Sequence, residues 1–357
     1  MKKNFTVCIA GKNEIAVFGA QQVLEKFPQI KIICLPNSDD PGFDTWQPSL
    51  KRFALSNKIQ IVDLQDCYSI KDLIFISLEF NKIIKPPLFK TKLLYNIHFS
   101  KLPKYRGMFT SSLPLLFGEK ESGVTLHEID SGIDTGNIID QISFNLDDIE
   151  SARQLYFRYL AVGKKLFLRN LKNVISGQFT SHPQSKTGES YFSKKSLNYS
   201  NISIDFNKSS FEVKNQIRAF IFQEYQLPNI YGWDINQCSI SSSRSRLKAG
   251  SIIKENQNEL IVSTKDNNVN LSKDYYNKVL KACVTNNVND LKKINLNSEI
   301  LERRNKKGET PLMIALNEDA VNVASHLIRN GAIIDVEDYR GNKLDPRVRY
   351  LVSKARN

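Results

Sequence analysis

The sequence predicts an α/β protein built on a parallel sheet, and three features support that class. Apolar segments of strand length alternate with helical segments through the first third of the chain, as in parallel βαβ units. A hydrophobic content of 41% over 357 residues can fill the cores of two or three domains. Polar side chains gather where one expected strand ends, and parallel sheets bind ligands at the carboxyl ends of their strands.

The first domain is expected to span residues 1–185. Its expected strands are Phe5–Ala10, Ile30–Leu35, Ile59–Val62, Leu73–Leu78 and Leu93–His98. Its expected helices are Val17–Phe27, Asp44–Leu55 and Ser151–Ile175. The last of these carries an apolar face at helical spacing, so we expect it to cover the sheet.

A small α+β linker module is expected over residues 186–265. It begins in a polar connector that is interrupted by proline and glycine. A helical segment, Ser210–Phe222, is followed by short strands such as Ser239–Ser242 and Leu260–Ser263.

The last part of the chain, residues 266–357, shows an internal period. Gly308 and Gly341 are 33 positions apart, and so are Ala282 and Ala315. This spacing predicts an α-helical ankyrin-like repeat, in which Thr310-Pro311 opens a helix as N-cap and first residue. One full repeat is too short for a free-standing solenoid, so we expect it to pack on the rest of the chain.

The formal net charge of +13 fits two kinds of partner. A basic surface is typical of nucleic-acid binders, yet the lysines are spread along the chain and no recognition helix or RNA-binding signature is present. An anionic small molecule such as a nucleotide diphosphate would suit the same charge. Charge alone does not separate the two.

Cysteine usage and hydropathy exclude several classes. The five cysteines form no CxxC pair, so neither a zinc ribbon nor a disulfide framework is expected. No run of about 18 apolar residues occurs, so no membrane-spanning helix is expected. The short apolar run after Lys2-Lys3 predicts a strand rather than a secretory leader, and the expected location is the cytoplasm.

Two polar residues on the fifth expected strand and one in a later loop are the candidate catalytic residues. Asn96 and His98 alternate on that strand, so both side chains point to one side of the sheet. Asp134 lies between Gly132 and Gly136, in a loop that can bend sharply toward them. Taken singly, a histidine on a strand and an aspartate in a turn are also typical structural residues.

Together the three groups suit the transfer of a carbonyl group to an amine. Such a reaction gives the carbonyl oxygen negative charge, which an amide and a protonated imidazole can stabilise with hydrogen bonds. A carboxylate beside the histidine raises the pKa of the ring, holds it in place and can pass on the proton of the attacking amine.

The motifs resemble those of the 10-formyltetrahydrofolate-dependent formyltransferases. That family carries Asn-x-His, then Ser-x-x-Pro-x-x-x-Gly, then an aspartate in a Gly-x-Asp-x-Gly loop. The matching residues are Asn96 and His98; Ser100, Pro103 and Gly107; and Gly132, Asp134 and Gly136. The resemblance spans roughly residues 1–200.

The resemblance implies a Rossmann-like parallel sheet with Asn96, His98 and Asp134 as catalytic residues and 10-formyltetrahydrofolate as co-substrate, without a metal. It also implies a slot for the pterin after the strand that ends at Leu78 and beside the loop near Ile129. The residues expected to bind the folate are Leu78, Phe80, Ile129 and Asp130.

Several segments resemble the branch of the family that acts on sugar nucleotides, and the ankyrin-like tail resembles enzymes for dTDP-linked 3-amino-3,6-dideoxyhexoses. The expected substrate-binding residues are Lys12, Asn13, Arg106, Gly107, Phe109, Lys195, Arg218 and Tyr225. Lys12 and Arg218 could bind phosphate, and Tyr225 could stack on thymine. A strand-to-helix turn, a solvated charge and a core aromatic account for the same residues equally well. The product would serve O-antigen or another surface polysaccharide.

Alternative acceptors remain open at this point: a dTDP-linked 4-amino sugar, or methionyl-tRNA, whose enzyme is expected to carry a basic β-barrel after the catalytic domain. Hydride transfer is disfavoured because the GxGxxG fingerprint of dinucleotide binding is missing. The resemblance also implies a homodimer with neither a nucleic-acid nor a membrane partner. The ankyrin-like tail could bind a second nucleotide or a protein, or could act as a structural cap.

Overall fold

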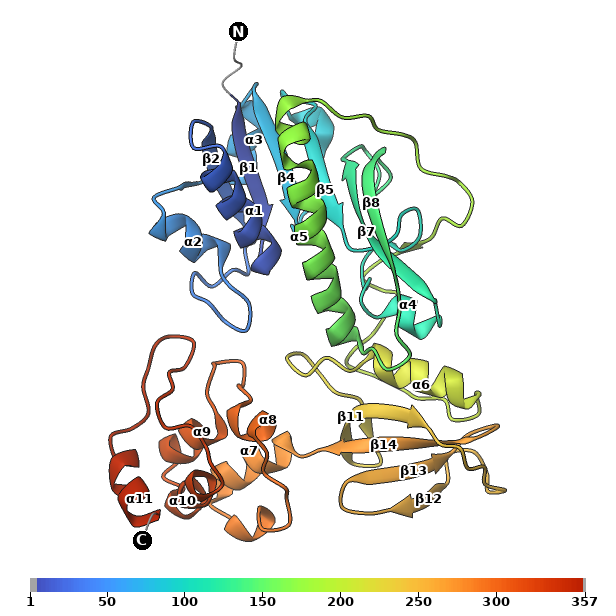
Figure 1. The fold of residues 1–357 in the computed structure, drawn as a ribbon, viewed down its shortest axis with the longest axis vertical. Helices are drawn as coiled ribbons and strands as arrows, with labels where there is room; N and C mark the ends of the chain where they lie inside the picture. The colour runs from blue at the N-terminus through green and yellow to red at the C-terminus, as the bar shows by residue number, and fades with distance from the viewer. Residues whose placement is uncertain (1–4, 356–357) are drawn as a thin grey trace. The chain divides into compact units, whose positions relative to one another are not determined.

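The computed structural model describes residues 5–355, which form two compact units (Figure 1). The first unit comprises the chain up to residue 43 together with residues 47–205 and 211–222. The second unit comprises residues 44–46, 206–210 and the chain from residue 223 onward. The first domain therefore extends past the expected boundary at 185, and the expected linker module is divided between the two units.

A seven-stranded sheet forms the centre of the first unit, with the strand order β3-β2-β1-β4-β5-β7-β8. Its strands are β1 (Thr6–Gly11), β2 (Lys31–Pro36), β3 (Gln60–Ile61), β4 (Leu73–Leu78), β5 (Leu94–His98), β7 (Glu121–Glu128) and β8 (Ile138–Asn145). The first five are parallel, as the sequence predicts, whereas β7 runs antiparallel to both β5 and β8. The hairpin of β7 and β8 was not foreseen.

The longest helix, α5 (Ala152–Ser176), packs beside α1 (Asn13–Lys26) and against the sheet (Figure 1). Ser151 and Gln154 form a capping box at the start of α5, and Gly177 ends it in the left-handed conformation. The sequence prediction for α5 is off by one residue at each end.

The expected helix Asp44–Leu55 is wrong in its first half, because α2 begins only at Leu50 and ends at Ser56. A proline at position 48 disfavours helical geometry in the residue before it, and the Ser49 side chain caps the helix by accepting a hydrogen bond from the Arg52 amide. The remaining short elements of the first unit are α3 (Leu64–Ser69), η1 (Pro86–Leu88), β6 (Arg106–Gly107), α4 (Leu113–Leu116) and β9 (Tyr191–Phe192). Helix α6 (Ser210–Ala219) ends three residues before the expected Phe222.

The second unit contains an antiparallel sheet with the order β10-β11-β14-β13-β12. Its strands are β10 (Asn229–Ile230), β11 (Trp233–Ile240), β12 (Ile252–Glu255), β13 (Glu259–Ser263) and β14 (Asn268–Asp274). The two strands expected from the sequence correspond to the end of β11 and to β13.

Helices follow the sheet within the second unit. They are α7 (Tyr276–Thr285), η2 (Val288–Asp290), α8 (Ser298–Glu302), α9 (Pro311–Asn317), α10 (Val321–Arg329) and α11 (Val348–Ala355). Thr310 caps α9 as expected, accepting a hydrogen bond from the Met313 amide. Ala282 and Ala315, which are one period apart, are both buried in the same core. The ankyrin-like character of these helices stays a prediction. Among residues 5–355 no helix is both long and apolar enough to cross a membrane.

Candidate active site

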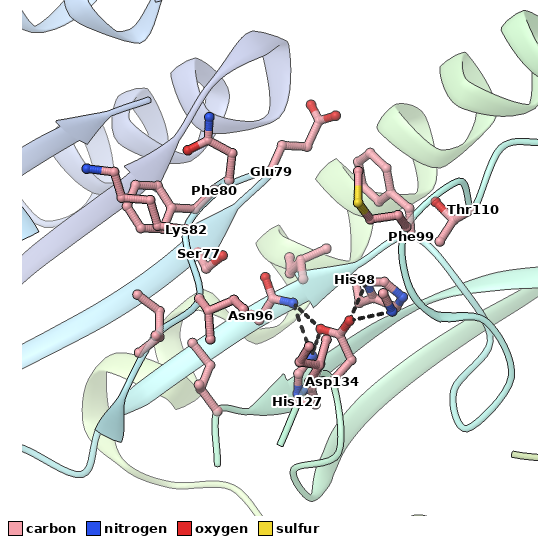
Figure 2. A pocket seen from close by; sticks show the side chains of 18 of the residues that line it. Ser77, Glu79, Phe80, Lys82, Asn96, His98, Phe99, Thr110, His127 and Asp134 are labelled. Atoms are coloured by element: carbon pink, nitrogen blue, oxygen red, sulfur yellow. Dashed lines mark hydrogen bonds and ion pairs between the residues drawn. The ribbon is translucent and has the colours of Figure 1, made fainter. Parts of the chain in front are cut away.

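The polar residues at the end of β5 come together with a loop from the β7–β8 hairpin. Strand β5 carries Asn96 and His98, and β7 pairs with it so that His127 lies directly opposite Asn96. The loop after β7 returns Asp134 to the same place. Figure 2 shows these four side chains turned toward one another on one wall of a cavity.

Asp134 is the centre of this cluster. One of its oxygens, Oδ1, accepts a hydrogen bond from Asn96 Nδ2 at 3.2 Å and lies 3.5 Å from His127 Nε2. The other, Oδ2, accepts from the Gly107 amide at 2.9 Å and lies 3.5 Å from His98 Nδ1. Both oxygens of the carboxylate therefore have polar neighbours. We call Asn96, His98, His127 and Asp134 together the Asp134 cluster.

The cluster keeps Asp134 ionised. Burial by itself would raise the pKa of this carboxyl, but His98, His127 and the Gly107 amide offset that effect and hold the pKa well below its usual range. The backbone of Asp134 is left-handed, with φ of 53°. Such a conformation is uncommon outside glycine, although aspartate tolerates it better than most residues.

The hydrogen bonds define the proton positions on the two histidines. His98 Nε2 lies 2.8 Å from the carbonyl oxygen of Tyr105, which can only accept, so Nε2 carries a proton. His127 Nδ1 lies 2.7 Å from the carbonyl oxygen of Glu128 and is a donor for the same reason. In a neutral His127 ring Nε2 is therefore an acceptor, and it receives a hydrogen bond from Asn96 Nδ2 at 3.1 Å.

The amide of Asn96 is consequently oriented. A carboxylate accepts hydrogen bonds only, so the NH2 group faces Asp134 and His127, and the amide oxygen points away from them (Figure 2). The sequence argument expected the Asn96 amide to donate to a substrate oxygen. In this structure the Asn96 NH2 group is directed at Asp134 and His127, at distances near the long end of the usual range. Asn96 can therefore donate to a substrate oxygen only if it gives up its hydrogen bond to Asp134 or to His127 when substrate binds.

The cavity has a volume of about 650 Å³, within the range of small-molecule sites. Beyond the Asp134 cluster, its wall includes five of the residues predicted to bind substrate or folate. These are Lys12, Phe80, Gly107, Ile129 and Asp130.

Four other predicted residues of the first unit do not line the cavity. Leu78 is fully buried and its carbonyl oxygen accepts from the Lys12 amide. Asn13 reaches Glu79 instead of the cavity. The Arg106 guanidinium is bonded to Gln184 and Glu189, and Phe109 packs its ring against Tyr199.

The last three predicted residues gain no support from their surroundings as ligands of a nucleotide. Lys195 is exposed, and its neighbour Lys194 lines the cavity in its place. Arg218 is only 4% exposed and donates to the backbone carbonyls of Asp147 and Asp148, so it anchors a loop. Tyr225 belongs to the second unit, where its ring packs edge-on against Trp46.

Sequence reasoning gave no role to several residues of the site. His127 and Glu79 were not singled out, because only the pairing of β5 with β7 and the end of β4 bring them to the cavity. The segment Tyr191–Lys194 joins the wall because β9 pairs with β6. In the sequence, the paired lysines Lys194 and Lys195 mark this segment as a candidate for phosphate binding, and Lys194 is the one that lines the cavity.

Neither cysteine chemistry nor a metal site is evident in the described part of the chain. All five cysteines are buried and free, and burial raises the pKa of the Cys34 and Cys283 thiols to about 12. Within residues 5–355 no group of three or more His, Cys, Asp or Glu side chains is arranged so that it could hold a metal ion.

A parallel sheet whose strand ends present a buried histidine–carboxylate cluster to a ligand-sized cavity defines an α/β enzyme. The family model for formyl transferases matches residues 68–171, and the model for the formyl transferase C-terminal domain matches residues 197–275. Two solved structures are similar over nearly their whole length. The chain belongs to the formyltransferase family and is an N-formyltransferase.

The first of these structures is WlaRD, a sugar 3N-formyl transferase solved in the presence of dTDP and 5-N-formyl-THF. It is 46% identical, with a TM-score of 0.71, over 76% of this chain and 98% of that one. The second is an N-formyltransferase from Helicobacter canadensis in complex with folinic acid and dTDP-3-aminofucose. It is 42% identical, also with a TM-score of 0.71, over 76% of this chain and 100% of that one.

Curated relatives include methionyl-tRNA formyltransferases. The enzyme from Fervidobacterium nodosum is 30% identical over 179 residues, which make up 50% of this chain and 54% of that protein. The enzyme from Streptococcus agalactiae is 28% identical over 49% of this chain and 56% of that protein. The chain thus spans about half the length of the curated relatives it matches.

Proposed function

We propose that the protein transfers the formyl group of 10-formyltetrahydrofolate to the amine of a dTDP-linked 3-amino-3,6-dideoxyhexose, for a surface polysaccharide such as O-antigen. The observation that supports this proposal most strongly is the identity of 46% and 42% to two sugar N-formyltransferases, extending over almost all of their length. Both relatives are described with a reduced folate and with dTDP or a dTDP-linked 3-amino sugar.

The cavity suits a folate by its chemistry. Apolar side chains line one part of it, where a flat ring could pack, and backbone groups at the end of β4 and in the loop after β7 can make hydrogen bonds. The apolar residues are Phe80, Ile83, Ile84, Ile97, Ile129 and Ile133. When bound, the folate supplies the formyl group, and the Asp134 cluster lines the same cavity.

In this proposal His98 takes up the proton of the attacking amine as the new C–N bond forms, and the same proton goes to the folate nitrogen as its bond to the formyl carbon breaks. Its Nε2–H is held by the Tyr105 carbonyl, and a proton on Nδ1 would face Asp134. An imidazolium at this position therefore has an acceptor for each of its two N–H groups, which lowers the cost of forming it. Asp134 stays ionised and stabilises that charge.

Asn96 completes the polar wall. Its amide faces the cluster in this structure, and an exchange of the Asp134 or His127 partner would free an N–H for the formyl oxygen as negative charge develops there. Lysines supply positive charge for the diphosphate of a nucleotide sugar. Those lining the cavity are Lys12, Lys82 and Lys194.

Formylation of methionyl-tRNA is the second candidate function, because the curated relatives that match at 28–30% identity carry that activity. Their match extends over about half of each protein. Binding of tRNA would make the affinity fall steeply with salt, since each phosphate contact releases counterions. A single nucleotide sugar would show a much weaker dependence.

The test is an acceptor panel. Purified protein is incubated with 10-formyltetrahydrofolate and dTDP-linked 3-amino and 4-amino dideoxyhexoses, with UDP-aminoarabinose and methionyl-tRNA as controls. Mass spectrometry should reveal the gain of one CO on the 3-amino sugar nucleotide alone. Formylation of a 4-amino sugar or of tRNA instead would overturn the assigned acceptor, and no formylation at all would overturn the assigned donor as well.

The family resemblance also leads us to infer a homodimer that acts in the cytoplasm and a helical region built on an ankyrin-like repeat. That region is proposed to bind a second nucleotide or a protein partner. Light scattering tests the dimer, and titration of the full chain with dTDP, with turnover measured in parallel, tests for a second nucleotide. A single binding event per chain would contradict a second nucleotide site.

A further inference from the structure

Glu79 stands at the end of β4, where the backbone leaves little freedom. Its φ of 58° is left-handed, and its carbonyl oxygen accepts a hydrogen bond from Asn37 Nδ2 at 2.9 Å. Gly11 pairs with Leu78 in the adjacent strand, and a Cβ atom at Gly11 would lie 1.8 Å from the Leu78 carbonyl oxygen. Only glycine permits this approach, so the start of the turn that carries Glu79 is held firmly.

The carboxyl group of Glu79 is oriented as well. Its Oε2 atom accepts hydrogen bonds from Tyr156 Oη at 3.0 Å and from Asn13 Nδ2 at 3.2 Å. Asn13 also has a left-handed backbone, with φ of 63°, so two strained residues meet at this carboxylate. Oε1 has no hydrogen-bond partner within residues 5–355.

Glu79 lines the same cavity as the Asp134 cluster and plays no part in that cluster. Figure 2 shows its carboxyl group apart from the dashed bonds around Asp134. Three carboxyl groups therefore line the cavity. Asp134 is engaged through both oxygens, and Asp130 accepts hydrogen bonds within its own loop. Glu79 has one oxygen without a partner among the described residues.

The charge state of Glu79 supports a binding role. Burial raises the pKa of this carboxyl to about 7, although the hydrogen bonds from Tyr156 and Asn13 and the ammonium of Lys12 act in the opposite direction. The groups that face it are Tyr156 on α5, Asn13 at the start of α1 and Lys12 in the turn after β1. Above about pH 7 the carboxyl group is ionised, and its Oε1 atom can then accept a hydrogen bond from a ligand.

We infer that Glu79 is an acceptor-binding residue, whose Oε1 atom receives the hydrogen bond of a ring hydroxyl next to the amine of the sugar. This role for Glu79 rests on the function proposed above. In it, Glu79 determines which amino sugar the protein accepts. Tyr156 and Asn13 act as positioning residues, because each donates a hydrogen bond to Oε2 and so fixes the carboxyl group at the cavity wall. Glu79 is half-buried and would be covered further when a ligand fills the cavity. An acceptor analogue that lacks the hydroxyl would then leave this carboxylate without a hydrogen-bond donor, which favours the hydroxylated sugar.

The test compares Glu79→Gln with the wild type on matched acceptors. The acceptors are a dTDP-linked 3-amino-3,6-dideoxyhexose and its counterparts that lack the hydroxyl on one side or the other of the amine. We expect Glu79→Gln to raise KM for the hydroxylated acceptor about tenfold or more, with a smaller change in kcat. KM for one of the deoxy acceptors should be the same for both proteins. KM for the folate should not change.

The matched control is Glu14→Gln, which also removes one carboxylate from the first unit. Glu14 pairs with Lys164 and does not line the cavity, so all KM values should stay at the wild-type level. In the wild type, KM for the hydroxylated acceptor should rise as the pH falls below about 7, because Glu79 becomes protonated. That rise should be absent in Glu79→Gln.

The possible outcomes are distinct. Equal effects of Glu79→Gln on hydroxylated and deoxy acceptors would overturn the assignment, because Glu79 would then only shape the cavity. A loss of kcat with unchanged KM would also overturn it, in favour of a role in proton transfer. Failure of the wild type to formylate any nucleotide sugar, which is measured first, overturns the proposed function and this assignment together.

Discussion

Two buried aspartates, one in each unit, show how the same side chain can serve different ends. Asp134 lies in the first unit beside two histidines, and Asp274 lies in the second unit beside Arg303. Their side chains are 14% and 6% exposed, so both carboxylates need partners to be tolerated. The partners differ in whether they can lose a proton.

Arginine keeps its proton under all ordinary conditions, so the Arg303–Asp274 pair, at 2.9 Å, is a permanent link. Arg303 also donates to the carbonyl oxygen of Gln223, and Asp274 accepts from the Tyr276 amide. A histidine gains and loses its proton near neutral pH. In the proposed mechanism the cluster in the first unit exchanges a proton with the substrate, whereas the pair in the second unit links two parts of the chain.

The largest effect is expected from Asp134→Asn. This variant keeps the shape of the side chain but removes the charge that stabilises a protonated His98, so kcat should fall by about a thousandfold. Asp274→Asn is the matched control and should keep the wild-type kcat at 25 °C. Steady-state formyl transfer measures both, and a near-normal kcat in Asp134→Asn would contradict the proposed mechanism.

The second prediction concerns stability, and here the larger effect is expected at Asp274. Asp274→Ala leaves Arg303 buried without its anion, which should lower the free energy of unfolding of the second unit by about 3 kcal/mol. Chemical denaturation followed by tryptophan fluorescence measures the loss, since Trp233 lies in that unit. A double variant that replaces both partners by apolar residues should recover much of the stability. No loss in Asp274→Ala would show that the pair is not structural.

A smaller effect is expected from His127→Ala. His127 contacts Asn96 and Asp134 and should act by positioning them, so kcat should fall about tenfold while the KM values change little. His127→Asn, which can restore a hydrogen bond to the cluster, should recover part of the loss. A decrease as large as that of Asp134→Asn would instead make His127 a proton carrier.

The smallest effect concerns acid stability. The pKa of Asp134 is lower in the folded chain than its ordinary value of 3.8, so the ionised group stabilises the fold above that pH and the stabilisation is lost as the pH falls through the lowered pKa. The difference in unfolding free energy between wild type and Asp134→Asn should stay constant from neutral pH down to about pH 5 and shrink below about pH 4. A difference that grows on acidification would contradict this sign.

The parallel sheet and the grouping of Asn96 with His98 were predictable because both depend on local patterns, whereas the catalytic role of these residues stays a proposal. Buried strands such as β4 are uninterrupted apolar runs, and the Asn-x-His spacing brings both side chains to one side of a strand. Asp134 could be associated with them only through the flanking glycines and the family resemblance. Its hydrogen bonds to Asn96 and to the Gly107 amide are findings of the structure.

Other parts of the site depend on contacts between distant segments, which the sequence does not reveal. The position of His127 follows from the register of β7 on β5. The position of Glu79 depends on hydrogen bonds from Asn37, which is 42 positions away in the sequence, and from Asn13, which is 66 positions away. For Arg218, the positive charge alone suggested a role that its surroundings do not support. A helical arginine suggests a phosphate ligand, yet burial and three backbone carbonyls make it an anchor.

Gln184 links two parts of the site that are far apart in the sequence. Its side-chain oxygen receives two hydrogen bonds from Arg106, and its side-chain nitrogen donates to the carbonyl oxygens of Asp134 and Gly136. Any shortened version of this enzyme that ends soon after α5 would keep every residue of the Asp134 cluster and still lose the clamp that aligns them. A fragment that keeps this clamp and the pairing of β9 with β6 has to extend through Phe192, well beyond the last residue of the Asp134 cluster.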